Sequence, residues 1–495
     1  MLQKVLTSKS KFSASNKSKA GIAIPRCHRV ASTPSFGDSK YMNSVKVPAS
    51  QGRFVGHAKH QRPQPDTEFL KVGPDTPCGE YLRRFWQPVC MTEELTRGVP
   101  VRLRILGEDL VAFKDLSGDY GLLHLHCSHR NTSLEFGFIA DHGIRCCYHG
   151  WHYAVDGTIL ETPGEPATSR IKDRVTHGAY PVVEWHGLLF AYMGPADEVP
   201  PFPMYDTMND LPGTELVPYK IVYPCNWLQV AENTMDPVHT VFLHSRLNRF
   251  QFEAAWQVMP MLEFHETPAR VYATLTYRWK DMIWVRTQET TYPNFSQVGA
   301  FWEDAEEEKY FKRASITKWT VAIDDDHCMI IAYRSFGPAI DPKERGNRAL
   351  VGLQSVDFDG QTELRSYDVM QRDPSDYEAQ VSIGPMATHG AENLGASDRG
   401  VALLRRNIRN GIQTVMNGGR VPRLPESGDE VPTYVQDTVM PFRQRPAEED
   451  EALMKALTAS VMDVVRRGDD LSGTARSEFI ERGLRALRND ARYRE

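Results

Sequence analysis

Short alternations of apolar and polar residues, which are typical of half-buried strands, run from about residue 85 to residue 195. The stretch VRLRILGEDLVAFKD, residues 101–115, alternates on both sides of Gly107-Glu108-Asp109, and this predicts a β-hairpin. The pattern as a whole predicts a small all-β domain over 85–195. Further β-rich runs bounded by Gly and Pro occupy 120–126, 157–164 and 180–194.

After PADEVPPFP, residues 195–203, the sequence contains both strand-type and helix-type patterns of apolar residues. Residues 270–279 and 319–336 predict strands of a second sheet. We therefore expect an α+β fold, in which 196–495 form a larger domain with an antiparallel sheet and covering helices, and 66–84 pack on that domain. A C-terminal helix is predicted from the apolar residues that share one helical face, namely Leu453, Leu457, Val461, Val464 and Val465.

The first 65 residues differ from the rest. The first sixty contain eleven Lys or Arg, many Ser and a single acidic residue, Asp38. A segment so poor in large apolar residues cannot bury enough surface to offset the entropy of ordering, so 1–65 are predicted to be a disordered basic leader. An organelle transit peptide is the alternative interpretation.

Composition and charge narrow the class of protein. The 495 residues are 41% hydrophobic and 25% charged, as in an ordinary soluble globular protein, and the net charge of −6 argues against a nucleic-acid-binding surface. No apolar run approaches the roughly 18 residues that span a bilayer. Of the eight cysteines only Cys127, Cys146 and Cys147 cluster, which indicates a reducing compartment, expected to be the cytoplasm, and a metal site.

The clustered cysteines belong to two ligand-rich segments. Cys127-x-His129 and Cys146-x-x-His149 present two thiolates and two imidazoles from two loops. A tetrahedral zinc ion accepts that set, and so does a [2Fe–2S] cluster with two cysteines on one iron and two histidines on the other. The spacing leaves both open. The β-rich, Gly-bounded setting differs from zinc fingers whose histidines share a helix.

A second group of candidate ligands lies in NWLQVAENTMDPVHTVFLH, residues 226–244. Asp236 and His239 are three apart and share one face of a helix. His239 and His244 are five apart, which on a regular helix separates them by about 140°. Convergence on one metal therefore requires a distortion, and Pro237, which lacks an N–H, is a plausible cause.

In this order and spacing the two motifs resemble those of the Rieske non-haem iron oxygenases, over roughly residues 67–440. The similarity is greatest to the oxygenase (alpha) components of the phthalate-dioxygenase-like branch, which includes phenoxybenzoate dioxygenases and dehydrodivanillate O-demethylases. It implies that Cys127 and Cys146 hold one iron of a [2Fe–2S] cluster, and that His129 and His149 hold the other. The residues left outside the motif are His124, His126, Cys147 and His152.

The same resemblance implies a mononuclear Fe(II) held by His239 and His244. Matching SDYEAQVSIGPM, residues 375–386, to the family pattern makes Asp376 the third ligand, with Asp373 as the competitor. Asn233 is implied to lie near the iron as a polar neighbour. Asp236 is implied to hydrogen-bond His149 of a neighbouring subunit, as an electron bridge within a homotrimer.

The implied activity is that of a terminal oxygenase in aromatic hydrocarbon catabolism, namely an aromatic-ring mono- or dioxygenase or an O-demethylase. Electrons from NAD(P)H pass through a flavin- and iron–sulfur-containing reductase, or a ferredoxin plus reductase, to activate O2. An aromatic substrate, carboxylated or methoxylated, is then hydroxylated or O-demethylated. An electron-transfer protein without oxygenase activity and a zinc-stabilised ligand-binding module are the alternatives. No motif between about 250 and 370 identifies the substrate.

Overall fold

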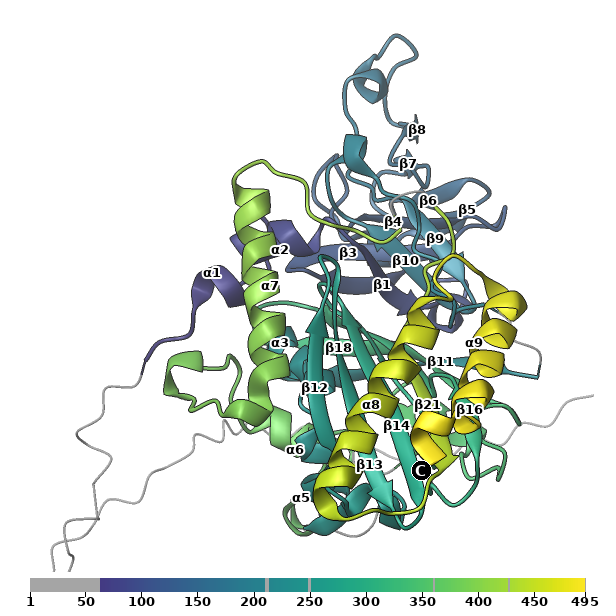
Figure 1. Cartoon of the computed structure of the whole chain (residues 1–495). Coiled ribbons are helices and arrows are strands. Elements are labelled where there is room, and N and C mark those ends of the chain that lie inside the picture. The colour runs from purple at the N-terminus through teal and green to yellow at the C-terminus, as the bar shows by residue number, and fades with distance from the viewer. Residues whose placement is uncertain (1–62, 210–212, 248–250, 359–360, 426–427, 495) are drawn as a thin grey trace, which may run out of the picture. The chain divides into compact units, whose positions relative to one another are not determined.

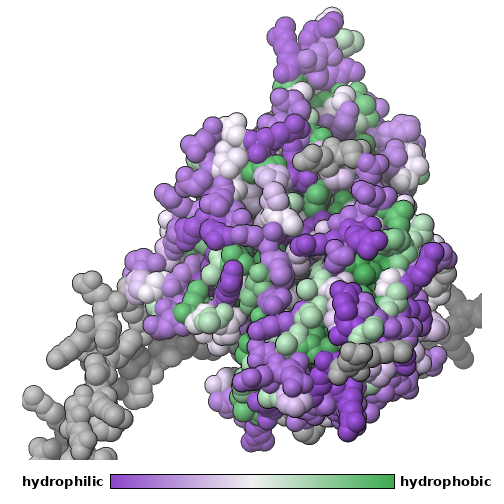
Figure 2. Space-filling view, in the orientation of Figure 1, coloured by the Kyte–Doolittle hydropathy of each residue, from purple (hydrophilic) through white to green (hydrophobic). Residues whose placement is uncertain are grey.

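The computed structural model describes residues 63–494 except for 210–212, 248–250, 359–360 and 426–427. The predicted leader over 1–65 therefore lies outside the described residues, apart from its last three positions. Among the described residues, no helix is both long enough and apolar enough to cross a membrane. Figure 2 shows a largely hydrophilic face on which apolar residues form small scattered patches.

Two short helices precede the first strand. They are α1 (Thr67–Leu70) and α2 (Pro77–Leu82), and Thr76 caps α2 by accepting a hydrogen bond from the Gly79 N–H. Helix α2 packs on α7 (Arg399–Met416), beside which both short helices lie in Figure 1. The buried Arg83 donates to the carbonyl oxygens of Val72 and Leu106, which ties this segment to the strands that follow.

Three small antiparallel sheets account for the predicted β region and confirm its all-β character. The predicted hairpin forms, but its turn lies one residue earlier than expected, because Leu106 and Gly107 adopt the left-handed conformations and Glu108 already belongs to a strand. The sheets are β1 (Trp86–Met91), β10 (Leu188–Tyr192) and β9 (Val182–Trp185); β2 (Val101–Ile105), β3 (Glu108–Lys114) and β4 (Tyr120–His124); and β5 (Phe138–Ala140), β6 (Gly143–Arg145), β7 (His152–Tyr153) and β8 (Ile159–Glu161).

A nine-stranded antiparallel sheet lies at the centre of the larger predicted domain, where an antiparallel sheet, though not its number of strands, was predicted. Its order is β11-β18-β17-β15-β14-β13-β12, with β21 paired to β14 and β16 paired to β21. Its strands are β11 (Glu215–Tyr223), β12 (Met261–Glu266), β13 (Arg270–Trp279), β14 (Met282–Thr291), β15 (Phe295–Val298), β16 (Lys309–Lys312), β17 (Ile316–Ala322), β18 (Cys328–Phe336) and β21 (Gln436–Pro441). The pair β19 (Val351–Gly352) and β20 (Ser355–Val356) forms a separate two-stranded sheet that packs beside β11.

Helices cover both faces of the large sheet. The predicted C-terminal helix is α8 (Ala447–Arg466), and with α9 (Gly473–Arg488) it lies across β13, β14 and β16 in Figure 1. An apolar core fills the space beneath these two helices and includes Ile283 and Val285 of β14. The segment that contains α3 (Trp227–Ala231) and α4 (Val238–Val241) contacts β14, β15 and β17. The remaining helices are α5 (Tyr367–Arg372), α6 (Asp376–Val381) and α10 (Ala491–Arg494).

One apolar core crosses the predicted domain boundary at residue 195. Phe190 of β10 packs edge-on against Trp319 of β17, with ring centroids 5.1 Å apart. Backbone hydrogen bonds reinforce this contact, since the Leu106 N–H donates to the Ala322 carbonyl oxygen. The β1–β10–β9 sheet is therefore packed directly on the large sheet.

Candidate active site

Two loops of matching geometry carry the predicted cluster ligands. The Cys127 carbonyl oxygen accepts the N–H of Asn131, and the Cys146 carbonyl oxygen accepts the N–H of Gly150, four residues later in each case. In both loops the cysteine N–H donates to the carbonyl five residues later. Asn131 and Gly150 have φ values of +56° and +73°, a region that Gly and Asn adopt most readily. The two loops thereby share a backbone turn, although the histidine follows its cysteine by two residues in one loop and by three in the other.

The four side chains come together as two pairs. Cys127 and Cys146 are buried side by side, and the His129 and His149 ring centroids are 4.6 Å apart. His129 also stacks on Trp151, with the ring planes only 2° apart. The structure thus places two thiols together and two imidazoles together, which is the division of ligands that a two-iron cluster with mixed ligands requires.

The residues present fit a cluster better than a single ion. Around one zinc ion all four ligand atoms lie about 4 Å from one another. Among the described residues, only two sets of three such atoms lie within 4.8 Å of one another, and neither includes Cys127, His129, Cys146 or His149. In addition, the buried Nδ1 of His129 has no hydrogen-bond partner among the described residues, as expected of an atom reserved for a metal.

The neighbouring histidines and the third cysteine lie away from these pairs. Cys147 is exposed, although it follows Cys146 directly. His124 is exposed beside Glu108, with Nε2 to Oε2 at 3.4 Å, and the exposed His126 contacts the carbonyl oxygen of Asn131 through Nδ1. His152 is buried within β7. This arrangement agrees with placing all four outside the motif.

The adjacent cysteines allow a direct test of the cluster assignment. Cys146→Ser is expected to abolish the [2Fe–2S] signal, since a buried thiolate ligand is lost. Cys147→Ser, one residue away, is the matched control and is expected to leave the signal at wild-type strength because the side chain faces solvent. Electron paramagnetic resonance (EPR) of the dithionite-reduced proteins distinguishes the two variants, and loss of the signal in Cys147→Ser would refute the assignment.

The segment with the second set of ligands is helical but irregular. The first helical part ends at Asp236, whose φ and ψ of −116° and 73° lie outside the helical region. This confirms the distortion that was predicted from Pro237, the next residue, which lacks an N–H. The chain then forms a π-helical turn, Phe242–Arg246, in which the Leu247 N–H bonds to the Phe242 carbonyl oxygen. Because a π turn brings residues five apart onto one face, this second distortion, which was not predicted, lets His239 and His244 face each other.

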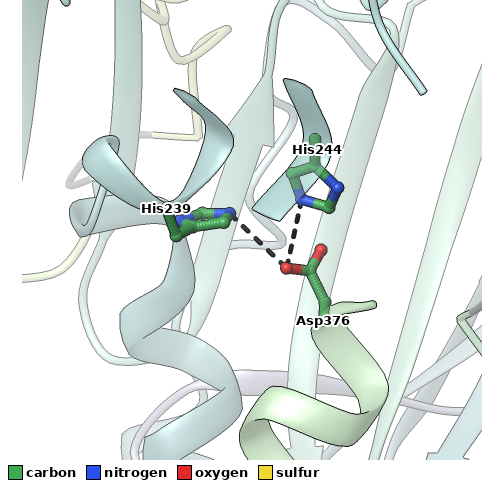
Figure 3. Close-up of side chains that lie close together, drawn as sticks. All are labelled: His239, His244 and Asp376. Carbon is green, nitrogen blue, oxygen red and sulfur yellow. Dashed lines mark ion pairs between the residues drawn. The ribbon is translucent and has the colours of Figure 1, made fainter. Parts of the chain in front are cut away.

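His239 and His244 converge with Asp376, which comes from a distant part of the chain (Figure 3). The Oδ1 atom of Asp376, at the start of α6, lies 3.5 Å from Nε2 of His239 and 3.2 Å from Nε2 of His244. Ligand atoms in adjacent positions around one ion, each about 2.1 Å from it, are about 3 Å apart. The donor set and spacing fit a two-histidine, one-carboxylate iron site that leaves coordination positions open.

Polar neighbours hold these side chains in orientation. Nδ1 of His239 contacts the Asp236 carbonyl oxygen, and Nδ1 of His244 lies 2.5 Å from Oε1 of Gln251. Oxygen acceptors at Nδ1 place the ring proton there, which leaves the Nε2 lone pairs facing Asp376. Asn233 donates through Nδ2 to Oδ1 of Asp376 at 3.3 Å, and that amide nitrogen also lies 3.2 Å from Nε2 of His239.

The histidines and the carboxylate also shift each other's proton affinity. Burial by itself raises the pKa of Asp376, but the nearby His244 and His239 more than offset this and hold that pKa well below its usual range. Burial lowers the pKa of His244, but the Asp376 carboxylate outweighs it, so the net pKa is raised. The competitor Asp373 caps the end of α5 and is not part of the converging set.

Glu232, which lies in the same segment as the two histidines, is part of a buried ion pair and does not belong to the converging set. Arg405 of α7 donates to Oε1 at 2.5 Å and to Oε2 at 2.7 Å of Glu232, which is only 7% exposed. Burial raises the pKa of Glu232 and Arg405 counteracts this rise. Arg405 therefore fixes α7 to the ligand-bearing segment and is unavailable for binding a substrate.

Arg405→Met is expected to destabilise the protein by about 3 kcal/mol, because breaking a buried pair leaves a carboxylate uncompensated. Arg406→Met is the matched control, since Arg406 pairs with the exposed Glu266 and such pairs contribute less than about 1 kcal/mol. Urea unfolding followed by circular dichroism, at equal iron content, measures both. Equal destabilisation of the two variants would contradict this role.

A cavity adjoins the converging triad. Its walls come from the segment that bears the histidines and from one face of the large sheet, and they include Phe252, Trp256, Phe301, Ile316, Lys318 and Arg286. Sequence motifs did not indicate Lys318, Gln251 or Gln361, the last of which donates to Oδ2 of Asp376 at 3.2 Å. Gln251 follows His244 by only seven residues, but no motif marked it, and Lys318 and Gln361 are distant from the histidines in sequence, so only the folded structure shows these contacts.

Comparison with known proteins identifies the family. A family model described as the Rieske [2Fe-2S] domain matches residues 85–179. The oxygenase subunit of a tert-butanol monooxygenase / tert-amyl alcohol desaturase from Aquincola tertiaricarbonis is 39% identical over 439 residues, covering 84% of this chain and 92% of that protein. Phenoxybenzoate dioxygenase subunit alpha from Ectopseudomonas oleovorans is 37% identical over 394 residues, covering 76% and 92%.

A third relative and a solved structure agree with these matches. The oxygenase subunit of 5,5'-dehydrodivanillate O-demethylase from Sphingobium sp. is 30% identical over 404 residues, covering 78% of this chain and 89% of that protein. The crystal structure of dicamba monooxygenase bound to dicamba aligns with a TM-score of 0.51 at 19% identity, covering 68% of this chain and 99% of that one, and so shares the fold.

The chain belongs to the Rieske non-haem iron oxygenases. It is an oxygenase component that uses a Rieske [2Fe–2S] cluster and a mononuclear non-haem iron. The predicted family, fold, enzyme class and cofactors are thereby confirmed. The oxygenase subunits among its relatives belong to multicomponent systems, which implies a separate electron donor.

Proposed function

We propose that this chain is the terminal oxygenase in which Cys127, His129, Cys146 and His149 hold the Rieske cluster and His239, His244 and Asp376 hold the iron. The observation that carries the proposal is the convergence of Asp376 on two histidines from a distant segment, with Nε2 to Oδ1 distances of 3.5 and 3.2 Å. We assign 66–84 to a packing segment, 85–195 to the cluster domain and 196–495 to the catalytic domain. The bacterial relatives support a cytoplasmic enzyme.

Electron delivery is proposed to cross between subunits of a homotrimer. In Figure 1 the strands that carry the cluster loops and helix α6, which carries Asp376, lie at opposite ends of the described chain. Asp236 supplies a surface contact for a neighbouring cluster, since its carboxylate is 39% exposed while its carbonyl oxygen contacts His239. The path then runs from His149 of the partner subunit through Asp236 to His239. A flavin- and iron–sulfur-containing reductase, or a ferredoxin with its reductase, supplies electrons from NAD(P)H.

The iron, when bound, supplies the site at which O2 is reduced next to the substrate. The protein's own residues prepare that site. Asp236 and Gln251 hold the ring protons of His239 and His244 on Nδ1, and Gln361 and Asn233 fix the Asp376 carboxylate. Apolar side chains, among them Phe252, Phe301 and Ile316, line part of the cavity and limit the room for water beside the site. Monooxygenation consumes O2, two electrons and two protons, inserts one oxygen atom into a C–H bond and releases water, whereas dioxygenation consumes the same reagents and adds both oxygen atoms to the ring.

The proposed substrate is an aromatic compound that is hydroxylated on the ring or at a methoxy group. Hydroxylation of a methoxy carbon gives an unstable hemiacetal that releases formaldehyde and leaves a phenol. Relatives named as phenoxybenzoate dioxygenase and dehydrodivanillate O-demethylase support this class. The aromatic residues Phe252, Trp256 and Phe301 in the cavity wall are compatible with it.

A small tertiary alcohol is the second candidate. The relative from Aquincola is named for tert-butanol and tert-amyl alcohol. The cavity measures about 70 Å³. A cavity of roughly 150 Å³ is known to hold benzene, so an aromatic ligand must extend beyond this cavity or displace its side chains, whereas a compound of four or five carbons needs less room.

Reconstitution with a reductase tests the proposed function. Methoxylated aromatic acids and tert-butanol are supplied separately, and NADH loss, O2 uptake and formaldehyde are measured together. Substrate-dependent O2 uptake that disappears in His239→Ala is the expected result. Unchanged uptake in that variant would favour a pure electron-transfer protein, and a colourless protein without a Rieske EPR signal would favour a zinc-binding module.

A further inference from the structure

One face of the large sheet forms a wall of the cavity next to the iron ligands. Strand register shows which residues share that face: Lys318 of β17 pairs with Ser296 of β15, which pairs with Thr290 of β14. Arg286 lies four residues before Thr290, so it faces the same side as Lys318. The cavity-lining residues follow this alternation and include Tyr219, Ile221, Arg286, Gln288, Lys318 and Ile330.

Among the described residues that line the cavity, two carry cationic side chains and one carries a carboxylate. The carboxylate belongs to Asp376 and the cations to Lys318 and Arg286. Arg286 is already occupied, since its Nη1 donates to both carboxylate oxygens of Asp437 at 3.0 and 3.1 Å and its guanidinium lies over the Trp256 ring. Its positive charge is therefore compensated within the protein.

Lys318, unlike Arg286, has no partner for its charge among the described residues. Its side chain is 7% exposed, and its ammonium has no hydrogen bond or ion pair among the described residues. Burial lowers the pKa of Lys318, and the Asp376 carboxylate opposes that shift. Asp376, however, is assigned to the iron. An Fe(II) ion with two neutral imidazoles and one carboxylate carries a net charge of about +1, so the assembled site does not compensate the ammonium.

We propose that Lys318 is a substrate-binding residue, and that the substrate carries an anionic oxygen group, such as a carboxylate, on an apolar body. A buried charge without a partner is costly, and a ligand carboxylate removes that cost through a charge-assisted hydrogen bond. The walls formed by Phe252, Phe301 and Ile316 suit the apolar body. This inference rests on the proposed function, because it takes the cavity beside Asp376 to be the oxygenase pocket.

Four probe ligands separate the contribution of the charged group to binding from that of the apolar part of the ligand. 3-Methoxybenzoate and 3-methoxybenzyl alcohol share an aromatic body, and pivalate and tert-butanol share a tert-butyl group. In each pair one member is an anion and the other a neutral alcohol. Binding to the complete, iron-loaded oxygenase is measured by the change each probe causes in the EPR signal of the Fe(II)–nitric oxide adduct, which requires no turnover.

The wild-type protein is expected to bind the anion of at least one pair more tightly than its alcohol. Lys318→Met is expected to weaken binding of that anion by about 10- to 100-fold and to leave binding of the alcohol unchanged, because only the anion uses the ammonium. Lys318→Arg should restore most of the anion binding. Lys280→Met, which removes an exposed lysine paired with Glu306, is the matched control and should have no effect.

Several results would overturn the proposal. If no anion binds the wild-type protein more tightly than its alcohol, the substrate is not recognised by its charge. If Lys318→Met weakens the alcohols equally, the ammonium serves a hydroxyl group. If Lys318→Met lowers the thermal midpoint of the ligand-free protein, the residue is structural, since removal of an uncompensated buried charge should leave the midpoint unchanged or raise it.

Iron and cluster content separate this inference from the proposed function. Loss of head-group preference in a Lys318→Met protein with full iron and cluster content supports the binding role. Retention of that preference at full content refutes the binding role but leaves the oxygenase assignment intact. Retention of iron by Asp376→Ala instead refutes the proposed iron site, whatever the behaviour of Lys318.

Discussion

Asp376→Ala is expected to lose the mononuclear iron while keeping the Rieske cluster. The carboxylate oxygen of Asp376 lies within 3.5 Å of both histidine Nε2 atoms, so its removal leaves two neutral ligands for a divalent ion. Loss of a hydrogen-bonding neighbour alone costs 10- to 100-fold in metal affinity, so loss of a ligand should reduce activity by more than about a hundredfold. Metal analysis and EPR of the reduced cluster measure both centres in one sample.

Asp373→Ala is the matched control for this variant. Asp373 lies three residues earlier, at the end of α5, outside the converging set. The Asp373→Ala variant should therefore keep iron and cluster at wild-type levels. Full iron content in Asp376→Ala together with iron loss in Asp373→Ala would move the third ligand to Asp373.

Asp236→Ala is expected to retain both metal centres and yet lose turnover. Its carboxylate is proposed to bridge to the partner subunit, while the contact to Nδ1 of His239 is made by its backbone and survives the substitution. The expected result is a fall of at least about a hundredfold in the rate at which a prereduced cluster is reoxidised by O2 and substrate, followed by stopped-flow absorbance. Asp236→Glu, which keeps the charge, should retain part of that rate.

Mixed oligomers give an independent test of the route across subunits. Chains with Cys146→Ser lack the cluster but keep the iron, and chains with Asp376→Ala lack the iron but keep the cluster. Neither chain is expected to be active alone. If electrons pass from the cluster of one subunit to the iron of the next, coexpressed oligomers should recover part of the wild-type activity. Complete inactivity of isolated mixed oligomers would show that transfer stays within one chain.

Local spacing was enough to predict two metal-binding loops, whereas the choice of a [2Fe–2S] cluster over zinc came from the resemblance to a family pattern. Each loop is closed by hydrogen bonds within about five residues, and Gly150 and Asn131 supply the left-handed conformation that the turns require. The strand alternation also predicted the small sheets. It misplaced the first hairpin turn by one residue, because Leu106, rather than a polar residue, enters the left-handed region.

The iron site could be predicted only in part. Residue spacing showed that His239 and His244 require a distortion, but a π turn leaves no simple signature in FLHSR, so its form was not predicted. Asp376 came from resemblance to a family pattern. Lys318 and Gln361 belong to segments whose approach to the histidines depends on the register of the sheet and on long loops, and neither can be inferred from local sequence.

The strands beneath the cavity have one face toward the cavity and the other toward the apolar core under α8 and α9. Along β14, Arg286 and Gln288 face the cavity, whereas Ile283 and Val285 pack under α8 and α9. Because adjacent positions point to opposite sides, a substitution on one side need not disturb the other. Substrate preference can therefore change through alternate residues of existing strands while the core that stabilises the sheet is preserved, which gives this scaffold room to evolve new specificities.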